Sequence, residues 1–253
     1  MRRFFRRLAG VVALLLVWEG FSRSGVLLKE YFPPPSEVFV QLWRMLGETE
    51  LLRDLVATLL AWLISIAVAV LIAVPGGLVL GSIPLVRTAV GAVIEFLRPI
   101  PAIAWWPLFY IIIEDGPQTK IALAAYAAIW PILFNIIYAL GDVDRGYLET
   151  ARSFGLSRLA ILVRVKLPDV LPFAITGLRI AATFALLVVV STELVFGGDL
   201  GIGVYLIRYG EESGRMDIVL AGAVLAGIVG FLSNSGFAAL QRKFVVWSPG
   251  ELR

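Results

Sequence analysis

The sequence predicts an all-α integral membrane protein with about six transmembrane helices and both termini in the cytoplasm. Of its 253 residues, 59% are hydrophobic and 16% are charged, a composition typical of membrane proteins. The apolar residues also stand in long blocks instead of short alternating patterns. A helix needs roughly 20 mostly apolar residues to cross the ~30 Å hydrocarbon layer, where it must satisfy its own backbone polar groups.

Residues 1–53 are expected to form one span followed by an amphipathic segment at the outer surface. Four arginines precede an apolar run over residues 8–18, which suits either a secretory signal or a spanning helix. We favour the helix because no small-x-small cleavage site follows. Three prolines at 33–35 predict a stiff connection. Apolar positions at helical spacing among charged ones over 37–53 then predict a helix that lies along the surface.

Five further spans are expected within a core of residues 54–243, and residues 244–253 form a cytoplasmic tail. The spans are predicted at about residues 55–80, 88–113, 121–140, 170–196 and 218–240. Hydropathy places their ends only to within a few residues. The longest cytoplasmic loop is then residues 141–168.

Basic residues set the predicted orientation, because loops rich in Lys and Arg stay in the cytoplasm. With the N-terminus inside, thirteen Lys and Arg fall in cytoplasmic segments and seven in outer segments. This asymmetry favours both termini inside. The net charge of +3 is therefore interpreted as a sign of topology, and no nucleic-acid partner is expected.

The composition argues against catalysis in this chain. It contains no Cys and no His, so disulfide, thiol and His-metal chemistry are excluded, and we expect no catalytic residue and no metal ligand. A Gly-x₄-Gly-Lys-Ser/Thr phosphate loop is also missing, so the chain cannot capture energy from ATP by itself.

The loop over 141–168 is predicted to fold as two short helices joined at Gly155. Glycine supplies a left-handed helix cap, and Ser157 can cap the next helix start. We expect the second helix to end before Pro168 and to place leucine and valine on one face and basic residues on the rest. Such a helix would lie at the membrane surface and present a short turn to a soluble partner.

The spacing within this loop resembles the EAA loop of ABC importer permeases, whose pattern is Glu-Ala-Ala, Gly, nine residues, then Ile-x-Leu-Pro. Thr150 replaces the first Ala and Val165 the Ile, both at packing positions. The matching residues are Glu149, Thr150, Ala151, Gly155, Val165, Leu167 and Pro168. Segments 32–38, 97–102, 106–108 and 177–181 look like the nitrate, sulfonate and taurine branch of that superfamily.

The resemblance implies a type I importer permease fold and a bacterial inner-membrane location. The implied partners are two cytoplasmic ATPase subunits that bind ATP and Mg, a second permease chain (most simply an identical one), the lipid bilayer, and a periplasmic or lipid-anchored substrate-binding protein. The seven matching residues would couple the permease to the ATPase, and the chain itself would hold no cofactor. A small, anionic solute is expected, and nitrate, taurine, other sulfonates and bicarbonate all stay open.

Several polar or helix-breaking residues in the predicted spans are candidates for the translocation pathway: Arg98, Pro99, Pro101, Asn135, Thr183 and Glu193. An intramembrane charge costs several kcal/mol if it faces lipid, so Arg98 either attracts an anion along the pathway, forms a buried ion pair, or extends to the interface. Glu193 could pair with Arg98 or shape the outer gate. Asn135 and Thr183 could equally bond between helices.

Two other classes of protein remain as alternatives. A secondary transporter driven by an ion gradient would usually carry internal repeats and acidic or His relays in its spans, and neither is evident. A multi-span membrane enzyme would need a clustered nucleophile, base or metal-ligand set, which is also not evident.

Overall fold

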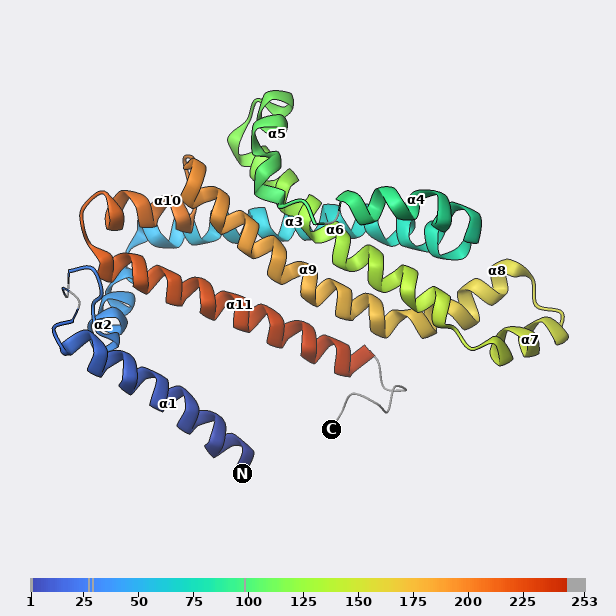
Figure 1. Cartoon of the computed structure of the whole chain (residues 1–253), viewed down its shortest axis with the longest axis horizontal. Helices are drawn as coiled ribbons and strands as arrows, with labels where there is room; N and C mark the ends of the chain where they lie inside the picture. Colours follow the sequence, from blue (N-terminus) through green and yellow to red (C-terminus); the bar gives the residue numbers. More distant parts are fainter. Residues whose placement is uncertain (1, 27, 29, 98, 245–253) are drawn as a thin grey trace. The chain divides into compact units, whose positions relative to one another are not determined.

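The computed structural model describes residues 2–26, 28, 30–97 and 99–244, and these residues form helices joined by short connections (Figure 1). This confirms the predicted all-α class. The chain divides into two compact units, Met1–Thr58 with Thr192–Val229, and Leu59–Ser191 with Gly230–Arg253. The long helices α3 (Thr49–Ser82), α9 (Leu167–Phe196) and α11 (Met216–Phe244) each contribute to both units. Residues 245–253 of the predicted tail lie outside the described residues.

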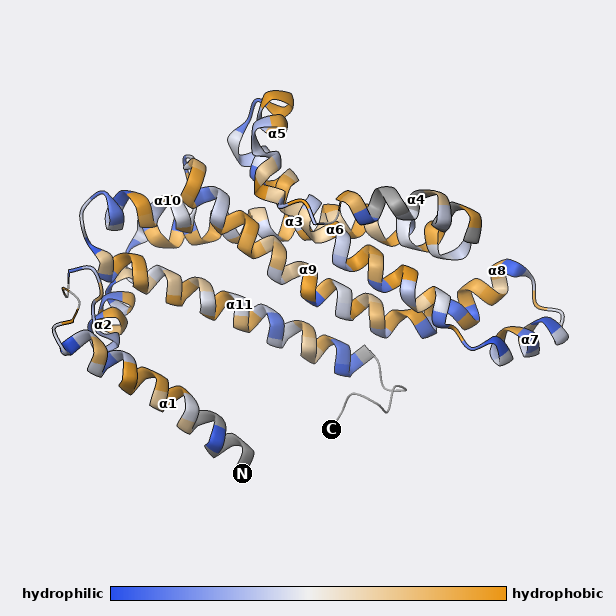
Figure 2. Ribbon diagram, viewed as in Figure 1, coloured by the Kyte–Doolittle hydropathy of each residue, from blue (hydrophilic) through white to orange (hydrophobic). Residues whose placement is uncertain are grey.

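Four helical segments are long and apolar enough to cross a membrane: Thr49–Ser82, Gly116–Asp142, Arg158–Phe196 and Met216–Lys243. Figure 2 shows their long hydrophobic stretches. They contain the spans expected at 55–80, 121–140, 170–196 and 218–240. The apolar run over residues 8–18 lies in α1 (Arg2–Arg23) and is shorter than the ~20 residues that a span requires. The count of six crossings stays a prediction.

The segment predicted as the span 88–113 is not one continuous helix. Helix α4 (Pro84–Leu97) is followed by a 3₁₀ turn, η1 (Ala102–Trp105), and by the short helix α5 (Trp106–Ile113). Pro99 and Pro101 lie in the interruption, where their missing amide donors and restricted φ angles disfavour a helix. Arg98 lies outside the described residues.

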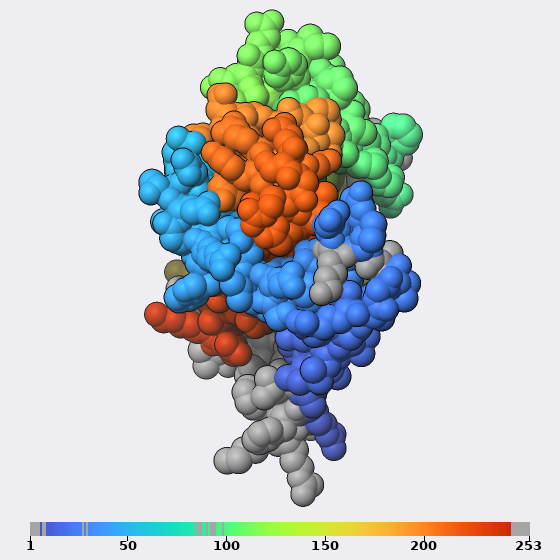
Figure 3. Space-filling view, turned by 90° about the vertical axis from the view of Figure 1, so that its left-hand side faces the viewer, coloured from blue at the N-terminus to red at the C-terminus, as the bar shows by residue number. Residues whose placement is uncertain are grey.

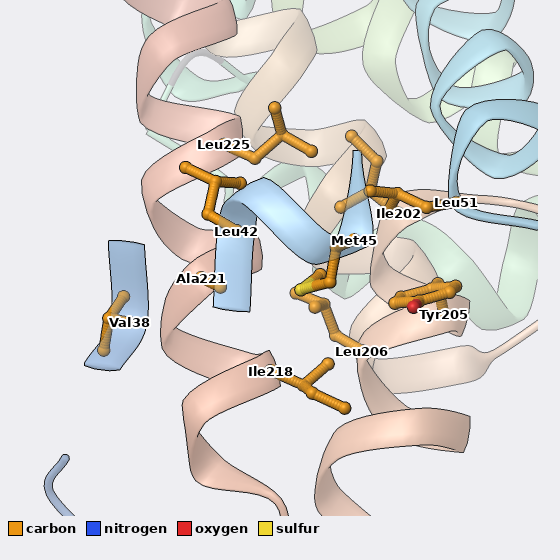
Figure 4. Packing of buried hydrophobic residues seen from close by; sticks show 10 residues of the cluster. All are labelled: Val38, Leu42, Met45, Leu51, Ile202, Tyr205, Leu206, Ile218, Ala221 and Leu225. Carbon is orange, nitrogen blue, oxygen red and sulfur yellow. The ribbon is translucent and has the colours of Figure 1, made fainter. Parts of the chain in front are cut away.

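The first unit has a core made by α2 (Pro35–Met45), α10 (Ile202–Leu206) and the beginnings of α3 and α11. Positions 38, 42 and 45 repeat at helical spacing, so α2 turns one face inward. Figure 4 shows this cluster, and Figure 3 shows residues 197–215 (orange) against the early part of the chain (blue). The buried members are Val38, Leu42, Met45, Leu51, Ile202, Tyr205, Leu206, Ile218, Ala221 and Leu225.

The predicted surface helix over 37–53 is divided in the structure. Helix α2 ends at Met45 and α3 begins at Thr49, with a turn at Gly47 whose N–H donates to the carbonyl of Arg44 at 3.0 Å. The inward face of α2 is buried in the core, while Trp43 on the other face is 80% exposed. The segment is therefore amphipathic as expected. However, it consists of α2, which packs into the core, and the first residues of α3.

Glycines bring the helices of the second unit close together. A Cβ atom at Gly77 would lie 2.9 Å from the Ile136 side chain of α6 (Gly116–Asp142), and one at Gly81 would lie 2.7 Å from Leu140. The two glycines are four residues apart, so they share one face of α3. At Gly177 of α9 a Cβ would lie 2.8 Å from the carbonyl oxygen of Pro131. Small residues that allow close backbone approach are typical of membrane helix pairs.

Candidate functional site

The loop between α6 and α9 begins with the short helix α7 (Arg145–Ser153), which Figure 2 shows to be largely hydrophilic. Asp144 precedes it, and the Asp144 carboxylate accepts a hydrogen bond from the N–H of Gly146 at 2.7 Å. This bond satisfies one of the amides that a helix start leaves without a partner, and the acid complements the helix dipole. The sequence thus fixes where α7 begins.

Helix α7 ends in a Schellman motif at Gly155. The N–H of Gly155 donates to the carbonyl of Arg152 at 2.8 Å, and the N–H of Leu156 donates to that of Ala151 at 3.2 Å. These are the two hydrogen bonds that define the motif, and Gly155 adopts the left-handed φ of +73° that it requires. The predicted left-handed cap at Gly155 is confirmed.

The motif turns the chain directly into α8 (Arg158–Ile161). Ser157 precedes α8, and its hydroxyl accepts a hydrogen bond from the N–H of Ala160 at 3.2 Å. The predicted cap at Ser157 is confirmed as well. Helix α7 packs beside α8 and the turn that follows it, so the loop is a closed hairpin (Figure 1).

Most of α7 is available to a partner. Glu149 and Thr150 are exposed, whereas Ala151 is buried and anchors the helix to its own unit. Two aromatic side chains flank the exposed acid, with Tyr147 64% exposed and Phe154 81% exposed. Exposed aromatic residues on a rigid polar element are typical anchors of protein interfaces.

The prediction that the second helix of the loop ends before Pro168 is wrong. Helix α8 continues through a π-helical turn, η2 (Leu162–Lys166), into α9, so residues 158–196 form one helical segment. In the π turn the N–H of Leu167 donates five residues back, to Leu162. The next residue, Pro168, has no N–H and needs no acceptor. Val165 and Leu167 are partly buried, and Pro168 is exposed.

A second candidate region is a cavity of about 440 Å³ in the second unit. It lies between the interruption after α4, one face of α6 and one face of α9. Three of the predicted pathway residues, Pro99, Pro101 and Asn135, line it. Thr183 is not among the lining residues, is exposed, and donates to the carbonyl of Arg179 in its own helix at 3.3 Å.

An aromatic ladder forms one wall of the cavity, and sequence reasoning missed it. Tyr126, Trp130, Phe134 and Tyr138 follow one another at intervals of four residues on α6, and their ring centroids lie 5.5, 6.4 and 5.9 Å apart. The spacing of four was the available signal. The indole N–H of Trp130 is buried and has no hydrogen-bond partner among the described residues.

Polar side chains bond to backbone carbonyls around the cavity. The hydroxyl of Tyr126 donates to the carbonyl of Leu97 at 3.1 Å, at the end of α4. The amide of Asn135 donates to the carbonyl of Pro131 in the preceding turn at 2.8 Å. Non-helical backbone at membrane depth is tolerated where such groups satisfy it or where it lines a cavity.

Glu193 lies in the first unit, within a buried polar network. Its carboxylate, which is 0% exposed, accepts hydrogen bonds from the hydroxyl of Thr58 at 3.0 Å and from the N–H of Gly203 at 3.1 Å. The hydroxyl of Thr58 accepts in turn from the N–H of Ile202 at 2.8 Å. The acid therefore caps the start of α10, next to Gly201, where a Cβ would approach the Glu193 carboxyl carbon to 2.2 Å. The predicted pair of Glu193 with Arg98 involves a residue outside the described part of the chain.

Known proteins resemble the chain over most of its length. Residues 73–246 match the family model described as binding-protein-dependent transport system inner membrane component. The taurine transport system permease protein TauC of Escherichia coli (strain K12) is 32% identical over 244 residues, covering 94% of this chain and 88% of that protein. The bicarbonate transport system permease protein CmpB of Synechocystis sp. is 27% identical over 253 residues, covering 96% and 88%. The methionine ABC transporter MetNI in an inward-facing form shares the fold, with a TM-score of 0.68 at 21% identity over 77% of this chain and 96% of that one.

Proposed function

Since the chain belongs to the family of binding-protein-dependent transport system inner membrane components, we propose that it is the permease subunit of an ATP-driven importer and that α7 couples it to a separate ATPase. It is a multi-pass protein of the bacterial inner membrane. The observation that carries the coupling proposal is the hairpin at 145–161. It exposes Glu149 and Tyr147 on a helix whose two ends are both capped, and Phe154 at the C-terminal cap.

The energy for transport must then arrive through this contact, because the chain has no phosphate-binding loop. Seating of α7 in a cleft of the ATPase would let closure of two ATPases on ATP and Mg move the loop. The helical segment 158–196 is continuous, so a displacement of α8 is passed to α9 without an intervening hinge at Pro168. Such movements of rigid helices switch access in transporters.

We propose that the cavity beside the aromatic ladder belongs to the translocation pathway. Its lining combines proline-broken backbone, the Asn135 amide and the buried indole N–H of Trp130. A buried donor without a partner calls for an acceptor, and the oxygens of a small anion such as a sulfonate or carboxylate would supply one. The taurine and bicarbonate relatives transport solutes of this class by name.

Replacement of Trp130 by Phe tests the pathway. It keeps the ring stacked in the ladder but removes the N–H donor, so we expect uptake of the anionic solute to fall several-fold while the ATPase still copurifies. The solute is found first, by screening the partner binding protein for anions that raise its unfolding temperature. Trp43→Phe is the matched control, since Trp43 is exposed on α2. Unchanged uptake by Trp130→Phe would remove Trp130 from the pathway.

Purification and reconstitution of the wild-type chain test the importer assignment against an ion-gradient-driven transporter. An importer permease should bring down an ATPase, and the reconstituted complex should hydrolyse ATP faster in the presence of the loaded binding protein. A chain that accumulates solute in liposomes alone, in response to an ion gradient, would contradict the proposal. The same purification reports whether one or two kinds of permease chain are present, for which we propose a homodimer.

A further inference from the structure

The hairpin at 145–161 also borders a hollow that Glu149 does not line. An open hollow of about 610 Å³ lies between α7, α8, η2 and the end of α3. This volume falls within the range of ~300–1,000 Å³ that small-molecule sites occupy. We call it the basic hollow, because Arg152, Arg158 and Lys166 line it and its lining contains no Asp or Glu.

The three cations of the basic hollow are not neutralised within the part of the chain that the structure describes. The ion pairs found there involve Arg23, Arg53 and Arg215, and none joins Arg152, Arg158 or Lys166 to an acid. Three like charges around one concave surface repel one another and attract an anion. Arg152 lies in the last turn of α7. The C-terminal end of that helix carries only a partial negative charge, so it does not neutralise the Arg152 side chain.

The position of the basic hollow indicates which anion it takes. Ser82, which ends the membrane-spanning helix α3, lines it, and Lys166 is the last residue before α9. Its wall also contains Leu159, which is 69% exposed, and Leu162. A surface that joins cations to an exposed leucine at the ends of spanning helices complements a phosphoryl headgroup with acyl chains beside it, and basic pockets of this kind bind anionic lipids.

We propose that the basic hollow binds the phosphoryl headgroup of an anionic membrane lipid. Arg152 and Arg158 would hold the phosphoryl oxygens through charge-assisted hydrogen bonds, and Lys166 would add a point charge. The lipid would thereby link α7 to the ends of α3 and α9. Glu149 does not line this site, although Arg152 follows it by one helical turn on α7.

Lipid titration of the delipidated full chain in detergent tests the proposal. Short-chain phosphatidylglycerol, short-chain phosphatidylcholine and inorganic phosphate are added in turn, and the unfolding temperature and the bound lipid seen by native mass spectrometry are recorded. We expect phosphatidylglycerol to bind at concentrations at least about tenfold lower than phosphatidylcholine, the equivalent of about 1.4 kcal/mol. Inorganic phosphate should give no stabilisation at those concentrations.

Substitutions of the cations that line the basic hollow test whether the lipid binds there. Arg158→Gln combined with Lys166→Gln should lose the preference for phosphatidylglycerol, whereas Arg164→Gln should keep it, because Arg164 is exposed on the same π turn but does not line the hollow. Arg158→Lys keeps the positive charge and should retain lipid binding. If the double variant does not fold, Arg158→Lys and Arg164→Gln are compared with the single variant Arg158→Gln. Equal binding by the double variant, an equal loss in Arg164→Gln, or stabilisation by phosphate alone would each overturn the proposal. So would loss of the ATPase from the double variant with lipid binding unchanged, which would assign the hollow to the ATPase contact.

Discussion

Glu193 is the residue around which the start of α10 is organised. A buried carboxylate is costly unless hydrogen bonds compensate it, and here Thr58 and the amide of Gly203 donate to it. Thr58 also accepts from the first amide of α10. One threonine hydroxyl therefore joins α3, α9 and α10 within the first unit.

Removal of this hydroxyl should destabilise the protein. Thr58→Val keeps the shape of the side chain but leaves the Ile202 amide without its acceptor and removes one of the donors to the Glu193 carboxylate, at a cost of about 1–3 kcal/mol. We expect the unfolding temperature, followed by tryptophan fluorescence in detergent, to fall by several degrees. Thr58→Ser keeps the hydroxyl and should lose less than half as much. Equal behaviour of the two variants would show that the hydroxyl contributes nothing.

Tyr205 makes the stability of the first unit depend on pH in the alkaline range. Burial, and then the hydrogen bond that its hydroxyl donates to Glu48, raise the pKa of Tyr205 well above its usual value of about 10. A folded-state pKa above the unfolded value means that the contribution to stability is complete below pH ~10 and is lost as the pH rises further. The unfolding temperature of the wild type should therefore drop more steeply above pH ~10 than that of Tyr205→Phe. Parallel pH profiles would contradict this account.

At the scale of the helices, close approach through glycine is the main packing device of the second unit. Gly81→Leu would drive a side chain into Leu140 and force α3 away from α6, and overpacking of this kind costs roughly 1–3 kcal/mol or more. We expect reduced yield of folded protein and earlier elution in size-exclusion chromatography. Gly76→Ala is the control on the same helix, because its Cβ would meet Leu133 at an ordinary 3.5 Å. If Gly81→Leu behaved like Gly76→Ala, the helices would not depend on this contact.

Local chemistry explains which elements the sequence could predict. The turn at Gly155 and the cap at Ser157 depend on residues within a few positions, so both were predictable and both are confirmed. The helix end before Pro168 was wrong, because the π turn at 162–166 shifts the hydrogen-bond register and has no sequence signature of its own. The prolines at 99 and 101 did signal a break, but hydropathy alone joined the two sides into one span.

Features that depend on helix pairing were beyond the sequence argument. The spacing of Gly77 with Gly81, and of Trp130 with the other ladder aromatics, was readable in the sequence, yet only the packed helices show which neighbours these faces meet. The cation cluster of the basic hollow likewise arises because the Schellman turn folds Arg152 back toward Arg158 and Lys166. Residues that are separated by a turn come together only once the geometry of that turn is known.

At the scale of the whole molecule, the chain has the features of one subunit of a larger transport complex. Its helices can cross the membrane and enclose a cavity lined by polar and aromatic groups, but its sequence contains no element that captures ATP. We propose that the exposed face of α7 supplies the missing connection. The short, doubly capped helix suits this task because a rigid contact transmits force better than a mobile loop.

The most direct test of this account is retention of the ATPase by variants at Gly155. A Cβ there would meet no atom within 4 Å, so Gly155→Val changes only the backbone preference. The left-handed conformation then costs ~1–2 kcal/mol or more. This cost lowers the population of the turn relative to other backbone conformations by roughly 5–30-fold. Asn tolerates that conformation, so Gly155→Asn is the matched control. We predict that Gly155→Val, like Glu149→Lys, inserts into the membrane but loses most of the copurifying ATPase, while Gly155→Asn retains it. Full retention by Gly155→Val and Glu149→Lys would contradict coupling through α7.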